Sequence, residues 1–280
     1  MGRDPVVLVT GAGGQVGRAL RTEIPQAQFQ ARADLDVTDA AAVRNAVAGV
    51  DIIIHLAALT NVDECERDPE RANAVNAVGT RNVVEAAGDR GRVVYVSTDY
   101  VFDGRKQGEY AEDDPPAPLN AYGRSKLAGE QYVRRRPQNL IVRTSWVFGV
   151  GRNFVTAILE GARMGGPLRV VDDQRGRPTW AQDLAASLAH LVRVRTPGIL
   201  HVAGDGEAAT WADLAELAVG AAGLSVAVER IDSETYRRHV GRVVATRPAN
   251  SVLSLERARR QGVPLIDWRC SVRRYVGKMA

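Results

Sequence analysis

Residues 6–17 read Val-Val-Leu-Val-Thr-Gly-Ala-Gly-Gly-Gln-Val-Gly. The first five form a short apolar run, which is typical of a strand buried on both faces of a parallel sheet. Gly11, Gly14 and Gly17 follow, and a helix is predicted over residues 16–23. Glycines allow a tight turn and let a pyrophosphate approach the helix N-terminus, where free N–H groups attract anions. These residues predict a dinucleotide-binding α/β fold, with a purely structural turn as the alternative.

Further apolar runs predict that the same sheet continues along the chain. Strands are expected at residues 28–32, 51–56, 92–97 and 140–144, with a last short strand at 199–202. Thr38 is expected to cap a helix that runs to Val47, and further helices are expected at 68–88, 153–164, 180–194, 211–222 and 267–278. Strands that alternate with helices are typical of a doubly wound, Rossmann-type parallel sheet.

The composition restricts the kinds of partner. The 280 residues are 45% hydrophobic and 25% charged, and the net charge of +4 is mild and spread out. We therefore expect no nucleic-acid partner, and no apolar run is long enough to span a membrane. Cys65 and Cys270 match no metal or redox spacing, and no signal peptide precedes the first strand. A cytoplasmic protein without a bound metal is predicted.

The cofactor site is predicted at the carboxyl ends of the first three strands, where ligands bind in open α/β sheets. An NAD-specific protein usually places an acid after the second strand, to hold the ribose 2′-hydroxyl. This chain has Arg32 there, and Arg18 follows the glycine loop. Both arginines favour NADPH, with NADH possible, although each could also be a solvated surface residue. The remaining predicted cofactor contacts are Gly11, Gly14, Gln15, Val16, Gly17, Asp36, Val37, Ala57, Ala58, Leu59 and Thr60.

The predicted chemistry lies in residues 120–130, Asn-Ala-Tyr-Gly-Arg-Ser-Lys-Leu-Ala-Gly-Glu. Tyr122 and Lys126 are four residues apart, so on a helix they share one face. A lysine beside a phenol favours the phenolate and lowers the pKa of the tyrosine, which brings a proton donor nearer to working pH. Thr98, at the end of a predicted strand, could donate a hydrogen bond to a substrate carbonyl. By itself the Tyr-x-x-x-Lys pattern also arises by chance on many helices.

Several motifs together resemble a known family. Residues 10–17, 97–104 (Ser-Thr-Asp-Tyr-Val-Phe-Asp-Gly) and 120–130 resemble the extended short-chain dehydrogenase/reductase superfamily. Within it, the chain is similar to the dTDP-4-dehydrorhamnose reductase family, also through residues 143–149, 173–179 and 247–251. The resemblance implies NADPH-dependent reduction of a dTDP-4-keto-6-deoxy sugar to dTDP-L-rhamnose. It makes Thr98, Tyr122 and Lys126 catalytic, and Lys126 and Tyr122 also contacts of the cofactor.

The resemblance also implies a second, smaller α/β domain for the sugar nucleotide. We expect residues 1–145 and about 178–203 to form the cofactor domain, and about 146–177 and 204–280 the substrate domain. Thr98, Asp99, Tyr100, Trp146 and Arg247 are the expected substrate contacts. Trp146 would stack on the sugar and Arg247 would clamp the diphosphate, with burial and a surface ion pair as the respective alternatives. The loop at 104–119 is long enough to be a flap over the cleft.

Alternatives to this function stay open. A sister 4-ketoreductase, such as one making dihydrostreptose, would share nearly every motif. The resemblance also extends to the regulatory β subunit of methionine adenosyltransferase, which binds NADP without such a reaction. Some relatives dimerise around magnesium held by glutamates, one of them just after the glycine loop. Arg18 and Ala19 stand there in this chain, so a monomer or weak homodimer is expected.

Overall fold

The computed structural model describes residues 3–240 and 244–279, and its centre is a six-stranded parallel sheet. The strand order is β10-β5-β4-β3-β1-β2, so the direction of winding reverses between β1 and β3. The strands are β1 (Val7–Thr10), β2 (Gln28–Gln30), β3 (Ile52–His55), β4 (Arg92–Thr98), β5 (Leu140–Thr144) and β10 (Gly198–His201). The predicted doubly wound fold and all six of these strands are confirmed.

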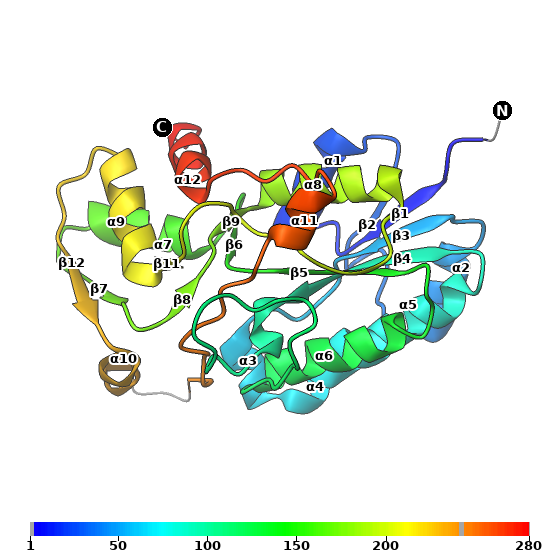
Figure 1. Ribbon diagram of the computed structural model, residues 1–280, viewed down its shortest axis with the longest axis horizontal. Helices are drawn as coiled ribbons and strands as arrows, with labels where there is room; N and C mark the ends of the chain where they lie inside the picture. Colours follow the sequence, from blue (N-terminus) through cyan, green and yellow to red (C-terminus); the bar gives the residue numbers. More distant parts are fainter. Residues whose placement is uncertain (1–2, 241–243, 280) are drawn as a thin grey trace.

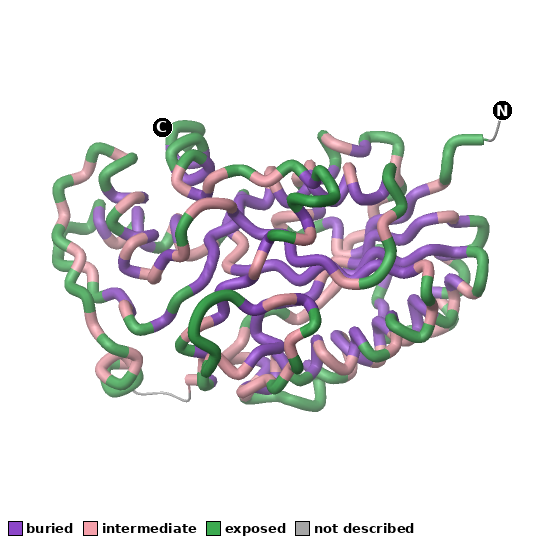
Figure 2. Tube along the Cα trace, in the orientation of Figure 1, coloured by how far each residue is buried: buried purple, intermediate pink, exposed green. Residues whose placement is uncertain are grey.

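Helices cover both faces of this sheet (Figure 1). One face carries α1 (Gln15–Glu23) and α8 (Ala181–Val194), and the other carries α2 (Ala40–Val47), α5 (Gly79–Ala87) and α6 (Ala121–Val133). Successive side chains of a strand point to opposite faces, so Val7 and Val9 pack with Leu20, whereas Leu8 packs with Val43. In Figure 2 the four central strands, β1, β3, β4 and β5, are therefore buried along almost their whole length, whereas the edge strands β2 and β10 are partly exposed.

One local prediction is wrong by one residue, and one short helix was missed. Asp39, and not Thr38, caps α2, because its carboxylate accepts hydrogen bonds from the amides of Ala41 and Ala42. Thr38 instead donates its hydroxyl to Asp36 at 2.7 Å. The helical region from residue 68 is present as α4 (Pro69–Asn73), a π-helical turn (Ala74–Val78) and α5, but α3 (Val62–Arg67), just before it, was not predicted.

Beside the sheet, a second group of elements forms the left part of Figure 1. α7 (Phe154–Arg163), α9 (Trp211–Ala221) and α12 (Trp268–Gly277) pack around Phe148, Trp180 and Trp268. β7 (Leu168–Val171) pairs with β12 (Val228–Ile231). The sequence had suggested that the strand at 199–202, β10, is the last one, and this prediction is wrong. The remaining elements are short: β6 (Val147–Phe148), β8 (Arg175–Gly176), β9 (Thr179–Trp180), β11 (Ala209–Thr210), α10 (Ser233–Val240) and α11 (Glu256–Arg260).

The segment 245–254, which we call the strap, connects the two parts. It pairs with residue Tyr110 through Leu253 and with Arg175 through Asn250. The loop 104–119 packs on this strap, and none of its residues lines the main cavity. The predicted role of that loop as a flap over the cleft is therefore wrong: Tyr110 of the loop pairs and packs with Leu253 of the strap instead. Among the described residues, no helix is long and apolar enough to cross a membrane.

Candidate active site

A cavity of about 700 Å³ opens at the carboxyl ends of β1, β3, β4 and β5. The glycine loop forms its floor. Gly11 has φ of +68°, and a Cβ there would lie 2.6 Å from the amide nitrogen of Ala57. A Cβ on Gly17 would lie 2.6 Å from the Cα of Ala12, so α1 can start this close to the turn only with glycine. The loop therefore leaves the N-terminus of α1 open to the cavity, as a pyrophosphate site requires.

Nearly every residue predicted for the site lines this one cavity. Arg18 is the exception: it is exposed and donates from Nε to the carbonyl oxygen of Gly13 at 2.9 Å. The predicted residues that do line the cavity are Gly11, Gly14, Gln15, Val16, Gly17, Arg32, Asp36, Val37, Ala57, Ala58, Leu59, Thr60, Thr98, Asp99, Tyr100, Tyr122, Lys126, Trp146 and Arg247.

Other lining residues were missed by sequence reasoning. The most informative are Ser97 and Thr144, at the ends of β4 and β5, and Trp211, the first residue of α9. A hydroxyl residue at the end of a predicted strand is a usable signal for the first two. The remaining ones are Gly13 in the glycine motif, Val147 in the motif 143–149, and Leu35, Leu56, Val62, Val75 and Val96, which belong to no motif.

Arg32 and Asp36, which follow β2 in the chain, both line the cavity. Hydrogen bonds from the amide and the hydroxyl of Thr38 lower the pKa of Asp36, and the charge of Arg32 lowers it further by a smaller amount. Arg32 therefore lies near an acid, in the part of the cavity where the adenosine of the cofactor is predicted to bind. A guanidinium in this place can bind a 2′-phosphate.

The segment after β3 is held in place by Asn76. The side-chain oxygen of Asn76 accepts from the amide of Leu59 at 2.8 Å, and its nitrogen donates to the carbonyl of Leu59 at 3.0 Å. The same nitrogen donates to the hydroxyl of Ser125 on α6 at 2.9 Å. One buried amide thus fixes the spacing between the backbone at Leu59 and the helix that carries Tyr122.

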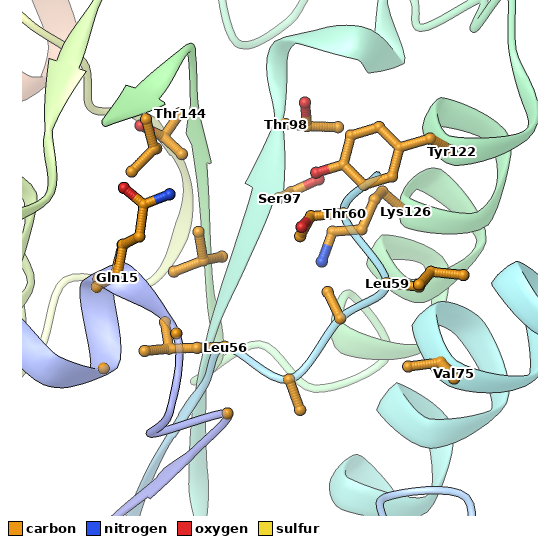
Figure 3. A pocket seen from close by; sticks show the side chains of 18 of the residues that line it. Gln15, Leu56, Leu59, Thr60, Val75, Ser97, Thr98, Tyr122, Lys126 and Thr144 are labelled. Carbon is orange, nitrogen blue, oxygen red and sulfur yellow. The ribbon is translucent and has the colours of Figure 1, made fainter. Parts of the chain in front are cut away.

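Tyr122 and Lys126 project from the first turns of α6 into the cavity (Figure 3). Asn120 caps the helix by accepting from the amide of Gly123, and a Cβ on Gly123 would overlap the carbonyl oxygen of Tyr100. Burial raises the pKa of Tyr122 above its ordinary value, more than a hydrogen bond with Thr98 lowers it. The expected lowering of this pKa by the lysine is therefore not present. The phenol stays protonated at neutral pH, which is the state that a proton donor needs.

Lys126 is buried, with its Nζ 4.1 Å from the centre of the Tyr95 ring. Burial lowers the pKa of Lys126 to about 7, against the opposite effect of Glu130. The lysine is therefore close to half-charged at neutral pH. A polar ligand that enters the cavity and accepts hydrogen bonds from Lys126 would favour its ammonium form.

Behind α6, a fully buried ion pair fixes the helix to the sheet. Arg143 of β5 donates from Nε and Nη2 to the two carboxylate oxygens of Glu130, at 2.9 and 2.8 Å. Both side chains are 0% exposed. Removing one partner of such a pair leaves a buried charge, which costs about 3–5 kcal/mol. The position of α6, and so of Tyr122, depends on this contact.

Thr98 and Asp99 form a buried network at the end of β4. Asp99 accepts hydrogen bonds from the hydroxyls of Thr98 at 3.0 Å, Ser145 at 3.1 Å and Ser251 at 2.5 Å. Burial raises the pKa of Asp99 to about 6, while these hydrogen bonds oppose the rise. Because Ser251 belongs to the strap, Asp99 joins the end of β4 to the strap. The hydroxyl of Thr98 thus contacts both the carboxylate of Asp99 and the phenol of Tyr122.

Trp146 and Arg247 also line the cavity. Trp146 adopts φ of +46°, and its ring lies parallel to that of Trp211, with centroids 3.7 Å apart. One face of Trp146 is thus already covered by an aromatic ring. Arg247 lies in the strap, 3.0 Å from the carboxylate of Asp63. Both members of this ion pair are partly exposed, at 22% for Arg247 and 16% for Asp63.

The chemistry of the cavity wall fits a dinucleotide. The side-chain oxygens of Gln15, Ser97 and Thr144 are buried and have no hydrogen-bond partner among the described residues. Figure 3 shows Gln15 extending toward Thr144 on one side of the cavity, with Ser97, Tyr122 and Lys126 on the other. Buried polar atoms normally have partners, so a polar group is expected between these walls. The glycine cradle at the floor has the shape for a pyrophosphate.

Comparison with known proteins gives a consistent set of similarities. Residues 5–280 match the family model described as the RmlD substrate binding domain. The chain is 42% identical over 275 residues to a dTDP-4-dehydrorhamnose reductase of Mycolicibacterium smegmatis, covering 94% of this chain and 82% of that protein. It is 42% identical over 223 residues to a dTDP-4-keto-6-deoxy-D-glucose reductase of Streptomyces niveus, covering 75% and 76%. The structure of a Bacillus anthracis dTDP-4-dehydrorhamnose reductase in complex with NADP superposes with a TM-score of 0.91, at 33% identity, over 99% of this chain and 100% of that chain.

Proposed function

Since this chain belongs to the dTDP-4-dehydrorhamnose reductase family, we propose that it reduces the 4-keto group of a dTDP-4-keto-6-deoxy-L-sugar with NADPH. The product is dTDP-L-rhamnose when the substrate is dTDP-4-dehydrorhamnose. One observation carries the proposal most directly. Tyr122, Lys126 and Thr98 share a single cavity with the glycine loop, so a proton donor and a dinucleotide site lie side by side.

The proposed cofactor site runs along the floor of the cavity. The glycine loop and the N-terminus of α1 would hold the pyrophosphate, and Arg32 would hold the 2′-phosphate of NADPH. Gln15 and Thr144 would face the nicotinamide. When bound, the reduced nicotinamide supplies a hydride to carbon 4 of the sugar. Sugar binding at the other end, near Trp146 and Arg247, would bring its keto group between the two halves of the site.

Tyr122 is proposed as the proton donor to the oxygen on carbon 4. Its raised pKa keeps the proton on the phenol until negative charge develops on that oxygen. Lys126 would stabilise the phenolate that forms and hold the nicotinamide ribose. Thr98 would stabilise charge on the oxygen, but its hydroxyl must first leave Asp99 in order to donate. General acid catalysis of this kind contributes roughly 10²–10⁴-fold to the rate.

The proposed division of the chain follows from this arrangement. Residues 1–145 and about 178–203 would bind the cofactor, and about 146–177 and 204–280 would bind the sugar nucleotide. In support, β10 completes the six-stranded sheet, whereas β7 and β12 pair outside it. We propose a monomer or weak homodimer, with a dTDP-sugar as the small-molecule partner.

The test is sugar-nucleotide-dependent oxidation of NADPH, with identification of the product sugar. dTDP-4-dehydrorhamnose should be reduced, and its product should co-migrate with dTDP-L-rhamnose. No oxidation of NADPH with any dTDP-4-keto-6-deoxy sugar would contradict the proposal, and a regulatory, non-catalytic role would replace it.

A second candidate is a sister reductase that acts on another dTDP-4-keto sugar. The similarity to the Streptomyces niveus dTDP-4-keto-6-deoxy-D-glucose reductase favours it, because that protein is as identical to this chain as the rhamnose-forming relative. The same assay separates the two candidates, since the stereochemistry of the product differs.

A further inference from the structure

Asp63 forms an ion pair with Arg247, the arginine proposed to bind the sugar nucleotide. One of its carboxylate oxygens accepts from Arg247 Nη2 at 3.0 Å and also from the amide of Ala245 at 3.0 Å. Arg247 Nη1 in turn donates to the carbonyl oxygen of Ala245 at 2.9 Å. The acid, the arginine and the backbone of the strap therefore form a closed ring of hydrogen bonds.

This ring fixes the orientation of Arg247 and leaves some of its N–H donors free for a ligand. A guanidinium has five N–H donors, and two of them are used within the ring. The guanidinium also interacts with the phenol of Tyr100, whose pKa burial raises and Arg247 lowers through its charge and a hydrogen bond. Arg247 lines the cavity, whereas Asp63 does not. The carboxylate thus stands behind the guanidinium, and an anion in the cavity meets the positive group first.

The place of Asp63 in the fold makes it a fixed support. It lies in the first turn of α3, which is capped by Asn61 and follows the cofactor-side segment that ends at Thr60. The neighbouring residue of the strap, Thr246, is held separately by a 2.8 Å hydrogen bond from Asn120, the cap of α6. In Figure 1 the strap descends from α11 to the region of α3 and α6. The arginine is therefore anchored from the half of the molecule that carries the cofactor loop.

We propose that Asp63 is a positioning residue for sugar-nucleotide binding, which holds Arg247 in the orientation that receives the substrate diphosphate. This inference rests on the proposed function, because it takes the diphosphate as the ligand of Arg247. An arginine that is ordered beforehand loses less side-chain entropy when the ligand binds. A carboxylate near a diphosphate would also repel it, but Arg247 stands between the two groups, so positioning outweighs repulsion. Removing Asp63 should therefore weaken binding.

The experiment measures binding of dTDP and of NADPH separately by calorimetry, with no turnover required. Asp63→Ala should weaken dTDP binding about three- to tenfold, as expected when one long side chain is no longer held in place. Asp63→Asn should lose less, because its amide oxygen can still accept from Ala245 and Arg247. NADPH affinity should stay unchanged in both variants. Glu64→Gln is the matched control: Glu64 is the next residue of α3 and pairs with Arg71 instead.

A double-variant cycle separates positioning from a general structural effect. In an Arg247→Met background, Asp63→Ala should no longer change the affinity for dTDP. Equal losses in both backgrounds would overturn the inference, as would unchanged or tighter dTDP binding by Asp63→Ala. If the unsubstituted protein binds no dTDP at all, the proposed function fails and this inference fails with it. If the unsubstituted protein binds dTDP normally and Asp63→Ala binds it equally well, this inference is overturned and the proposed function stands.

Discussion

Replacing Lys126 by methionine should stabilise the fold and weaken the cofactor site. The ammonium is buried, and burial lowers its pKa from 10.5 to about 7. Each tenfold change in proton affinity corresponds to about 1.4 kcal/mol, so keeping the charged lysine inside costs about 5 kcal/mol at pH 6. Methionine keeps an unbranched side chain of similar length and removes that cost.

The stabilising effect of Lys126→Met should decrease as the pH rises. Because the folded-state pKa lies below the unfolded value, the unfolded chain binds more protons between about pH 7 and 10.5, and the folded state gains stability as the pH rises. The cost of the lysine should fall from about 5 kcal/mol at pH 6 to about 2 kcal/mol at pH 9. The advantage of Lys126→Met over the parent should therefore shrink by about 3 kcal/mol.

Denaturant unfolding at pH 6 and pH 9, followed by tryptophan fluorescence, measures this difference. Lys278→Met is the control, because Lys278 is exposed at the end of α12 and its loss should leave the pH dependence of the parent in place. NADPH affinity should fall in Lys126→Met only. The reasoning is refuted if Lys126→Met is less stable than the parent at pH 6, or if its advantage does not change with pH.

Three further outcomes test the proposed site. Tyr122→Phe should lower turnover by roughly 10²–10⁴-fold while NADPH affinity is kept, and parent-like turnover would remove Tyr122 from the mechanism. Arg32→Ala should reduce the preference for NADPH over NADH, measured by titrating both, and an unchanged ratio would leave Arg32 a surface residue. Arg247→Ala should raise the Michaelis constant for the sugar nucleotide about tenfold or more, as for a lost charge-assisted hydrogen bond, and a normal constant would exclude the clamp.

The sequence was sufficient for those parts of the fold that are encoded locally. The strand that ends at Thr10 and the glycines after it are adjacent in the chain, so the turn between them is encoded within a few residues, although Ala57 and Gln30 also contact it. Tyr122 and Lys126 were also found from local spacing. Helix caps are also local, because a cap acts on amides a few residues away, yet the predicted cap of α2, Thr38, was wrong by one residue.

The rest depends on contacts between distant residues. Trp211 lines the cavity because α9 packs against α7 and α12. No sequence pattern around residue 211 predicts that packing. The pKa of Tyr122 was predicted with the wrong sign, because the pattern shows the nearby lysine but does not show how completely both groups are buried. The flap was wrong for a similar reason: a loop rich in proline and acids gives no sign that Tyr110 pairs with the strap.

The strap also sets an order of events during synthesis of the chain. Its contacts to Asp63 and Asp99 join residues 184 and 152 positions apart, so neither can form until the strap has left the ribosome. Five of the six strands of the sheet, and the whole glycine loop, precede it by a hundred residues or more. A nascent chain can thus complete the cofactor edge before Arg247, the one strap residue that lines the cavity, has been added. A chain cut short before residue 245 would keep the glycine loop, Tyr122 and Lys126, and would lack Arg247.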